Sequence, residues 1–381
     1  MHGPEFRETS SHAFLPTAED PLKTWIDEAK NPSSGTVASG LLNDEQFDII
    51  CLVLISVLQL INITGVVTNS LNIAVFVRLG LAEPSNISLL ALAVCDLTCM
   101  VLSMWTNLCY LPPFRDSPLP FHPTNVTLLA GGGLYSFMVR TVAWITAFIT
   151  FERCLCILVP LKVKRLITPR TTTTAMLVIG TLTVLPYLLT YTRYKFEWVF
   201  SPNVNATILD VVHIDTNIAI LLEKVVMTIC GVIQPMLAFV IVIVCTIFLV
   251  VRLKRVSSWR ASVTTGNLNL REDMSGESAA PSKVSAKSSV SSKEQLLVKM
   301  VVAIATIFII CFIPTFIMLL LAALFDEFFM FGIYKRIFIT NGLITFLGQS
   351  LSGTVNIIIY YTMASKYRAC LRCLLRLDHQ G

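Results

Sequence analysis

The chain has 381 residues, of which 54% are hydrophobic and only 14% are charged, and its mean hydropathy is +0.71. These values exclude an ordinary soluble domain, which carries more charge and fewer apolar residues. The net charge of +5 gathers in short basic segments between apolar runs, and nothing in it indicates a nucleic-acid surface.

Seven apolar runs follow one another, at 49–79, 86–111, 125–158, 171–191, 216–254, 295–325 and 334–361. Each contains the roughly 20 residues that a helix needs to cross about 30 Å of hydrocarbon. Alternating strands of about ten residues, as a membrane barrel requires, are not visible. The sequence therefore predicts an all-α membrane protein, with a seven-helix transmembrane domain over 49–361.

Residues 1–48 are mostly polar, and we expect them to form a disordered extracellular segment. They show no basic stretch followed by an apolar core, so we expect no cleavable signal peptide. Asp44, Glu45 and Asp48 precede span one, whereas the segments after spans three, five and seven are rich in Lys and Arg. The positive-inside rule then places the N-terminus outside the cell and the C-terminus in the cytoplasm, and we expect a multi-pass protein of the plasma membrane.

Four Asn-x-Ser/Thr sequons bear on this topology. Asn125 and Asn205 fall in predicted outer loops, whereas Asn62 lies inside span one and Asn86 at an inner loop. Only Asn125 and Asn205 are therefore expected to carry glycans.

Polar side chains interrupt the first three spans. Asn69 stands in GVVTNSLNI, Asp96 in LLALAVCDL, and span three ends in ITFERCLCILVP with Glu152 beside Arg153. An arginine in mid-bilayer costs at least ~2.5–3.5 kcal/mol on insertion scales, so such residues usually pair with each other or face a cavity. The Glu152–Arg153 pair alone is a weak signal, which becomes strong beside the other intramembrane polar residues.

Arg140 lies 13 residues before Arg153 in the same span, about 20 Å along the helix and deep in the bilayer. Two interpretations remain open. Its guanidinium faces a water-filled cavity and binds an anionic group, or it pairs with a neighbouring carboxylate or backbone carbonyl.

Two segments flank the last spans. Residues 256–292 are rich in Ser, Ala and Lys and are expected to form a disordered third cytoplasmic loop. Residues 362–381 contain SKYRACLRCLLRL, which predicts a short amphipathic eighth helix, and its Cys370 and Cys373 favour palmitoylation. No metal-ligand spacing appears among the 11 cysteines, and no metal or cofactor is indicated.

The order of these polar residues resembles the rhodopsin-like (class A) G-protein-coupled receptors over about 49–376. In that family span one carries Asn, span two Asp, span three ends in Asp/Glu-Arg-Tyr, span six has Cys-Trp-x-Pro and span seven has Asn-Pro-x-x-Tyr. Here the same places hold Asn69, Asp96, Glu152-Arg153-Cys154, Cys311-Phe312-Ile313-Pro314 and Asn356-Ile357-Ile358-Ile359-Tyr360, and span five has the expected Pro235.

The resemblance implies a switch that admits a heterotrimeric G protein, with arrestin and a receptor kinase as further partners. Glu294 lies 20 residues before Pro314, about 30 Å down span six, and can face Arg153. We expect Glu152 and Glu294 to hold Arg153 at rest and span six to swing outward about the Pro314 kink. Asn356 and Tyr360 belong to the same switch.

The family geometry also predicts a ligand cavity. Tyr135 stands where amine receptors carry an aspartate and Ser350 where an opsin carries its retinal lysine, so both of those classes are disfavoured. The residues expected to line the cavity are Tyr135, Ser136, Arg140, Thr315, Phe316, Phe346 and Gln349.

Several positions depart from the family. The usual disulfide between span three and the second outer loop is missing, because its place in span three holds Leu128 and residues 192–217 contain no cysteine. A bond between Cys51 and Cys109 is conceivable. Val142 replaces a serine that often helps to bind sodium, so Asp96 and Asn356 form at most a partial, doubtful sodium site.

Within the family, ITFERCLCILVPLKVKRLITPR is similar to the chemosensory receptors of gastropod molluscs, which predicts a small water-borne ligand. The alternative is a neuropeptide receptor of the FMRFamide type, in which Asp326 and Glu327 would meet a basic peptide. A transporter would show repeats and broken helices in two halves, a channel would show charge rings, and an enzyme would show a nucleophile with its base. None of these features is visible. A further alternative keeps the receptor fold but has lost signalling.

Overall fold

The structure is a computed structural model that describes residues 43–115, 117–190, 192–201, 205–214, 216–273, 292–325 and 334–375. The chain divides into two compact units, Met1–Gln46 and Phe47–Gly381. Only residues 43–46 of the first unit are described. The disorder predicted for residues 1–42 therefore falls outside the described part of the chain. Within residues 43–46 the backbone N–H of Gln46 donates to Asn43 Oδ1 at 2.7 Å, as in a helix N-cap.

Seven helices in the described part of the chain are long and apolar enough to cross a membrane, and the predicted seven-helix bundle is confirmed. Spans one, two and four are α2 (Asp44–Leu79), α3 (Pro84–Tyr110) and α8 (Pro169–Thr190), and spans six and seven are α11 (Ser292–Leu324) and α12 (Lys335–Met363). Span three comprises α5 (Pro123–Thr127), η1 (Leu128–Gly133) and α6 (Leu134–Leu158), and span five comprises α9 (Asn217–Val226), η2 (Met227–Ile233) and α10 (Gln234–Asp273). Shorter helices are α4 (Pro112–Arg115), α7 (Pro160–Leu166) and α13 (Ser365–Leu374).

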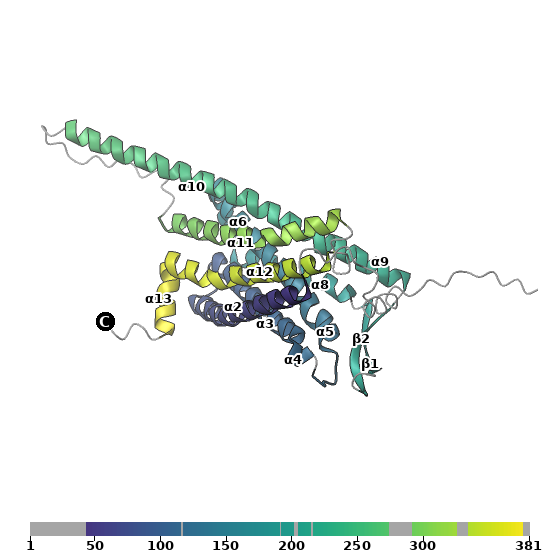
Figure 1. The fold of residues 1–381 in the computed structure, drawn as a ribbon. Helices are drawn as coiled ribbons and strands as arrows, with labels where there is room; N and C mark the ends of the chain where they lie inside the picture. The colour runs from purple at the N-terminus through teal and green to yellow at the C-terminus, as the bar shows by residue number, and fades with distance from the viewer. Residues whose placement is uncertain are drawn as a thin grey trace, which may run out of the picture. The chain divides into compact units, whose positions relative to one another are not determined.

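Span three is the central helix of the bundle, because α6 contacts α3, α8, α10 and α11. Its Phe137 and Ile145 are fully buried. Span four is peripheral by contrast, and its Leu177 and Leu182 are 67% and 60% exposed. A helix satisfies its own backbone hydrogen bonds, so a row of exposed apolar side chains on it can face lipid. Figure 1 shows α11 and α12 running side by side, in agreement with their extensive contact.

The two ends of the bundle carry different groups. The end with the last turn of α6 and the start of α13 is called the Arg153 end, and the end with β1 (Tyr194–Ser201) and β2 (Ala206–His213) is called the hairpin end. Exposed basic side chains gather at the Arg153 end, a distribution that the positive-inside rule associates with the cytoplasm. They are Lys162, Arg165, Arg170, Arg252, Lys254, Arg255, Lys366 and Arg372.

Two π-helical segments interrupt spans three and five toward the hairpin end, and the sequence did not predict them. Pro235 follows η2; it lacks an N–H, and its ring would clash in an α-helix with the carbonyl of Gly231, four residues earlier. The wider π turn accommodates this proline without breaking the span. In η1 the carbonyl of Leu129 accepts a hydrogen bond from the hydroxyl of Tyr187 in span four.

Polar contacts tie the antiparallel hairpin of β1 and β2 to span five. Arg193 Nε donates to Glu223 Oε2 at 3.2 Å, and the Tyr194 hydroxyl donates to Glu223 Oε1 at 2.5 Å. Burial and the bond to Glu223 raise the pKa of Tyr194, so its hydroxyl remains a donor at neutral pH. Glu223, in α9, thus holds the base of the hairpin.

Backbone contacts tie the other edge of the hairpin to the loop before span three. The backbone N–H of Leu209 donates to Pro120 O at 2.8 Å, and the N–H of His122 donates to Leu209 O at 2.9 Å. Cys51 and Cys109 are both free thiols, so the conceivable disulfide between them is not formed here. Hydrogen bonds and an ion pair therefore order the loop that a disulfide usually anchors in the resembling family.

We expect a glycan on Asn205 and none on Asn125, although the sequence predicts both. Asn205 is exposed in the hairpin turn with φ 49°, whereas Nδ2 of Asn125, the atom that would carry the glycan, donates to Asp210 Oδ1 at 2.9 Å. Asn205→Gln should abolish the gel shift that a glycosidase produces, and Asn125→Gln should preserve it. The reverse pattern would contradict this assignment.

Span five continues far beyond its apolar part. α10 runs to Asp273, so residues 256–273 are helical, and the prediction of a disordered loop over 256–292 is wrong for this stretch. Extension of an existing helix adds one hydrogen bond per residue without a new nucleation cost, which composition alone does not reveal. Residues 274–291 lie outside the described part.

α13 is the predicted amphipathic eighth helix. Tyr367 and Leu371 are buried, while Lys366 and Arg372 are exposed. Residues 376–381 of the predicted tail lie outside the described residues.

We expect palmitoylation at Cys373 rather than at Cys370. Cys373 is exposed, whereas Cys370 packs against the core and its Sγ lies 4.0 Å from Val75 O in span one. Cys373→Ser should abolish incorporation of a clickable palmitate analogue, and Cys370→Ser should retain most of it. Equal loss in the two variants would show that both thiols are modified.

Candidate functional site

A buried ion pair lies at the Arg153 end. Glu152 and Arg153 are 2% and 8% exposed and pair with each other, and Arg153 Nη2 also donates to Ser85 Oγ at 2.8 Å in the first turn of α3. Arg153 Nε and Glu152 Oε2 are buried and have no hydrogen-bond partner among the described residues. Glu294, the second predicted partner, falls within α11, but its side chain lies outside the described part.

This pair uses only part of the bonding capacity of its two charges. A buried charge that lacks one partner is costly, so a conformation that offers further hydrogen bonds would compete well with the one observed. Cys154, the third residue of the motif, donates from Sγ to Cys245 O at 3.5 Å and links span three to span five. The site can therefore exchange partners while span three stays attached to its neighbours.

A second polar cluster lies in the middle of spans one, two and seven. Asn356 Nδ2 donates to Asp96 Oδ2 at 3.1 Å, and Asn69 Nδ2 donates to Gly65 O at 3.0 Å and Gly353 O at 3.4 Å. Gly353 lets span seven lie close to Asp96 of span two, because a Cβ at this glycine would lie only 3.0 Å from Asp96 Cγ. The structure thus joins Asn69, Asp96 and Asn356, which the sequence had placed in three different spans.

Tyr360 belongs to an aromatic cluster rather than to a hydrogen-bond network. Its ring lies 5.2 Å from Phe76 and 5.4 Å from Tyr367 between centroids, and its buried hydroxyl has no hydrogen-bond partner within the described ranges. Tyr367 donates to Asn72 Oδ1 at 2.5 Å, and burial raises its pKa, so it stays protonated. Asn72 Nδ2 donates in turn to Asn69 Oδ1 at 3.2 Å, which couples α13 to the mid-span cluster.

The sequence missed a third polar chain, centred on Asn62. Asn62 is fully buried; its Nδ2 donates to Ser103 Oγ at 2.9 Å, and its Oδ1 accepts from Ser350 Oγ at 2.8 Å. These bonds connect spans one, two and seven. The signal in the sequence is an asparagine inside an apolar span, where a polar side chain needs a buried partner.

Stacked aromatic rings connect span six to span five. Within span six, the buried Phe312 stacks on Phe308 at 4.0 Å between centroids. Between the two spans, Phe316 stacks on Phe239 of α10 at 3.7 Å. Pro314 lies inside α11 between these pairs. A change in the position of Phe312 or Phe316 therefore acts on the helix next to its proline.

A cavity of about 130 Å³ opens between spans three, five, six and seven. The Tyr135 hydroxyl donates to Gln349 Oε1 at 2.7 Å, and Gln349 Nε2 donates to Thr315 Oγ1 at 3.4 Å, which bridges spans three, seven and six. Gly231, Pro235, Phe312 and Thr345 line it as well. All seven residues expected to form the ligand site line this one cavity: Tyr135, Ser136, Arg140, Thr315, Phe316, Phe346 and Gln349.

Arg140 lies in the wall of this cavity. Its guanidinium carbon is 4.4 Å from the centroid of the Phe137 ring, and its Nη1 is buried without a hydrogen-bond partner in the described part of the chain. A Cβ on Gly231, in η2, would lie 3.7 Å from Nη2. The π segment of span five therefore faces the guanidinium with a glycine, which leaves room beside it.

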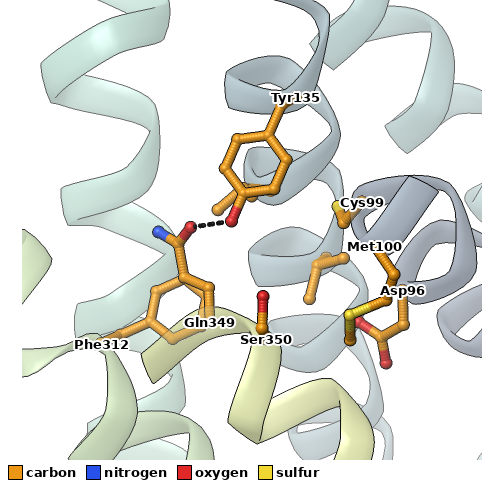
Figure 2. A pocket seen from close by; sticks show the side chains of 9 residues that line it. Asp96, Cys99, Met100, Tyr135, Phe312, Gln349 and Ser350 are labelled. Atoms are coloured by element: carbon orange, nitrogen blue, oxygen red, sulfur yellow. Dashed lines mark hydrogen bonds between the residues drawn. The ribbon is translucent and has the colours of Figure 1, made fainter. Parts of the chain in front are cut away.

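A smaller cavity of about 10 Å³ adjoins the first and shares Tyr135, Phe312 and Gln349 with it. Figure 2 shows Tyr135, Gln349, Ser350 and Asp96 around this space. Such a volume holds about one water molecule. Asp96, which with Asn356 forms at most a partial and doubtful sodium site by sequence, borders it.

A family described as the serpentine type 7TM GPCR chemoreceptor Srw matches residues 56–378, which contain all seven spans from the middle of α2 onward and both cavities. No curated protein matches the chain significantly.

Proposed function

Because the chain belongs to the Srw family of serpentine seven-transmembrane G-protein-coupled chemoreceptors, we propose that it converts binding of a small extracellular ligand into G-protein activation by releasing Arg153. The family is one of multi-pass membrane receptors and not of enzymes. The specific mechanism rests on the contacts of this chain.

One observation carries the proposal: span six borders both the ligand cavity and the packing around the Arg153 end. Phe312 and Thr315 line the cavity, while Val301 and Ile304, nearer the start of α11, belong to the same core cluster as Cys154 of span three. A helix that contacts both regions transmits a displacement from one to the other when it moves as a rigid body.

The proposed transition starts at the aromatic stacks. A ligand in the cavity displaces Phe312 or Phe316 and favours a different angle of α11 at Pro314, where the proline has removed one helical hydrogen bond. The half of α11 at the Arg153 end then swings away from α6. Arg153 leaves Glu152 and Ser85 and offers its hydrogen bonds to a helix of the G protein.

Orientation and narrower class are part of the same proposal. We place the Arg153 end in the cytoplasm and the hairpin end outside the cell, following the basic side chains at the Arg153 end. The rhodopsin-like class and the resemblance to gastropod chemosensory receptors remain proposals, as do arrestin and receptor kinase as partners. The alternative of a basic peptide ligand involved Asp326 and Glu327, which lie outside the described residues.

A G-protein activation assay in transfected cells tests the proposal, with small water-soluble acids, amines and amino acids beside short amidated peptides. We expect responses to small solutes only. A response to peptides alone would move the protein to the neuropeptide receptors, and no response to any compound at normal surface expression would favour a receptor that has lost signalling.

A further inference from the structure

We propose that the Arg140 cavity is a site for a small organic monoanion, a carboxylate with a compact apolar body. This inference rests on the proposed function and names the chemical class of its ligand. It decides between the two interpretations of Arg140 that the sequence left open.

The first argument is the missing counter-ion. Among the described residues Arg140 forms no ion pair, its Nη1 has no hydrogen-bond partner, and no acidic side chain lines the cavity. Asp96, which borders the adjoining space, accepts a hydrogen bond from Asn356 at 3.1 Å. The ring of Phe137 compensates the cation only in part, because it offers no hydrogen-bond acceptor in the plane of the guanidinium. An intramembrane arginine in this state favours an anion from outside the chain.

The second argument is the chemistry of the remaining wall. Tyr135, Phe312, Phe316 and Phe346 present aromatic surface, which suits an apolar ligand body. Thr345, 3% exposed, lines the cavity from span seven and carries a buried hydroxyl without a partner in the described chain. We expect this hydroxyl to turn toward a bound ligand and form one further hydrogen bond with it.

The third argument is size and charge. A cavity of about 150 Å³ holds benzene, so a volume of about 130 Å³ fits a ligand of roughly six or seven non-hydrogen atoms, such as a short branched carboxylate, and not a peptide of several residues. The planar guanidinium matches a carboxylate with two parallel hydrogen bonds. One cation balances one negative charge, and the apolar wall does not replace the hydration of an inorganic ion.

The test is thermal unfolding of the full-length receptor in lipid nanodiscs, with benzoate, benzamide, benzylammonium, 3-methylbutanoate, chloride and phosphate as probes. Each is used at about 10 mM, which saturates a site with a Kd of ~1 mM. We expect at least one carboxylate to raise the melting temperature by about 2 °C or more, and the amide, the amine and the inorganic ions to leave it unchanged.

Three variants identify the residues involved. Arg140→Met should abolish the shift. Without ligand this variant should melt at or above the wild-type temperature, because an apolar side chain of similar length replaces an unpaired buried cation. Thr345→Val should weaken the affinity by about tenfold. Lys224→Met, which removes an exposed cation in α9, should behave as wild type.

Several results would overturn the inference: no shift with either carboxylate, an equal shift with benzamide or phosphate, or a carboxylate shift that survives Arg140→Met. Stabilisation by a carboxylate without G-protein activation would instead leave this site standing and refute the proposed receptor function, so the two failures are distinguishable.

Discussion

Arg153→Ala is expected to abolish ligand-driven G-protein activation. In the structure Arg153 pairs with Glu152 and donates to Ser85, and the proposed active state transfers these hydrogen bonds to the G protein. Alanine has none to transfer. The measurement is nucleotide exchange on the G protein in membranes that contain equal amounts of surface receptor, and we expect at least a tenfold loss, which corresponds to about 1.4 kcal/mol.

The single variant leaves Glu152 as a buried carboxylate without its counter-ion, which typically costs about 3–5 kcal/mol and lowers the amount of folded receptor. The double variant Glu152→Gln/Arg153→Ala removes that charge and should restore expression while remaining inactive. Glu152→Gln alone should raise basal activity, because it weakens only the resting state. Normal signalling by the double variant would refute the role of Arg153 as the switch.

Gly348→Ala should destabilise the receptor by about 1–3 kcal/mol, the usual range for overpacking a close contact. A Cβ at Gly348, in span seven, would lie 2.4 Å from the backbone oxygen of Cys311 in span six. A backbone atom cannot rotate away as a side chain can, so the two helices must separate. A lower melting temperature and a lower surface level in cells are the expected results.

Gly342→Ala is the matched control in the same helix, because nothing lies within 4 Å of a Cβ at that position. It should melt at the wild-type temperature or slightly above it, since alanine favours a helix by up to ~1 kcal/mol relative to glycine. If both variants melt like wild type, the close approach of Gly348 to the Cys311 carbonyl does not hold spans six and seven together near Pro314.

The seven spans could be predicted because each needs about 20 apolar residues, a signal that does not depend on the neighbours of a helix. The lining of the cavity could be predicted for a related reason. Arg140 follows from counting 13 residues back from Arg153, whereas Tyr135, Thr315 and Phe316 follow from the geometry of the resembling family, which applies because the segments between them and Arg153 or Pro314 are regular α-helix. Their proposed role in binding remains a prediction.

Features that depend on contacts between helices could not be read from the sequence. The chain through Asn62, Ser103 and Ser350 requires three spans to meet, and each member alone is an ordinary polar residue. Thr345 was missed because its place in the wall is set by the packing of span seven. The helical residues 256–273 were missed because composition describes a segment without the helix that precedes it.

The π-helical segments η1 and η2 divide spans three and five into two sections with separate helical phases. One residue corresponds to a rotation of about 100° around a helix, so a π turn changes which side chains beyond it face the bundle. A residue gained or lost near the hairpin end can be absorbed within such a turn, while positions toward Arg153 keep their faces. In a lineage of such receptors, the sensing section can therefore diversify by insertion and deletion while the signalling section is inherited unchanged.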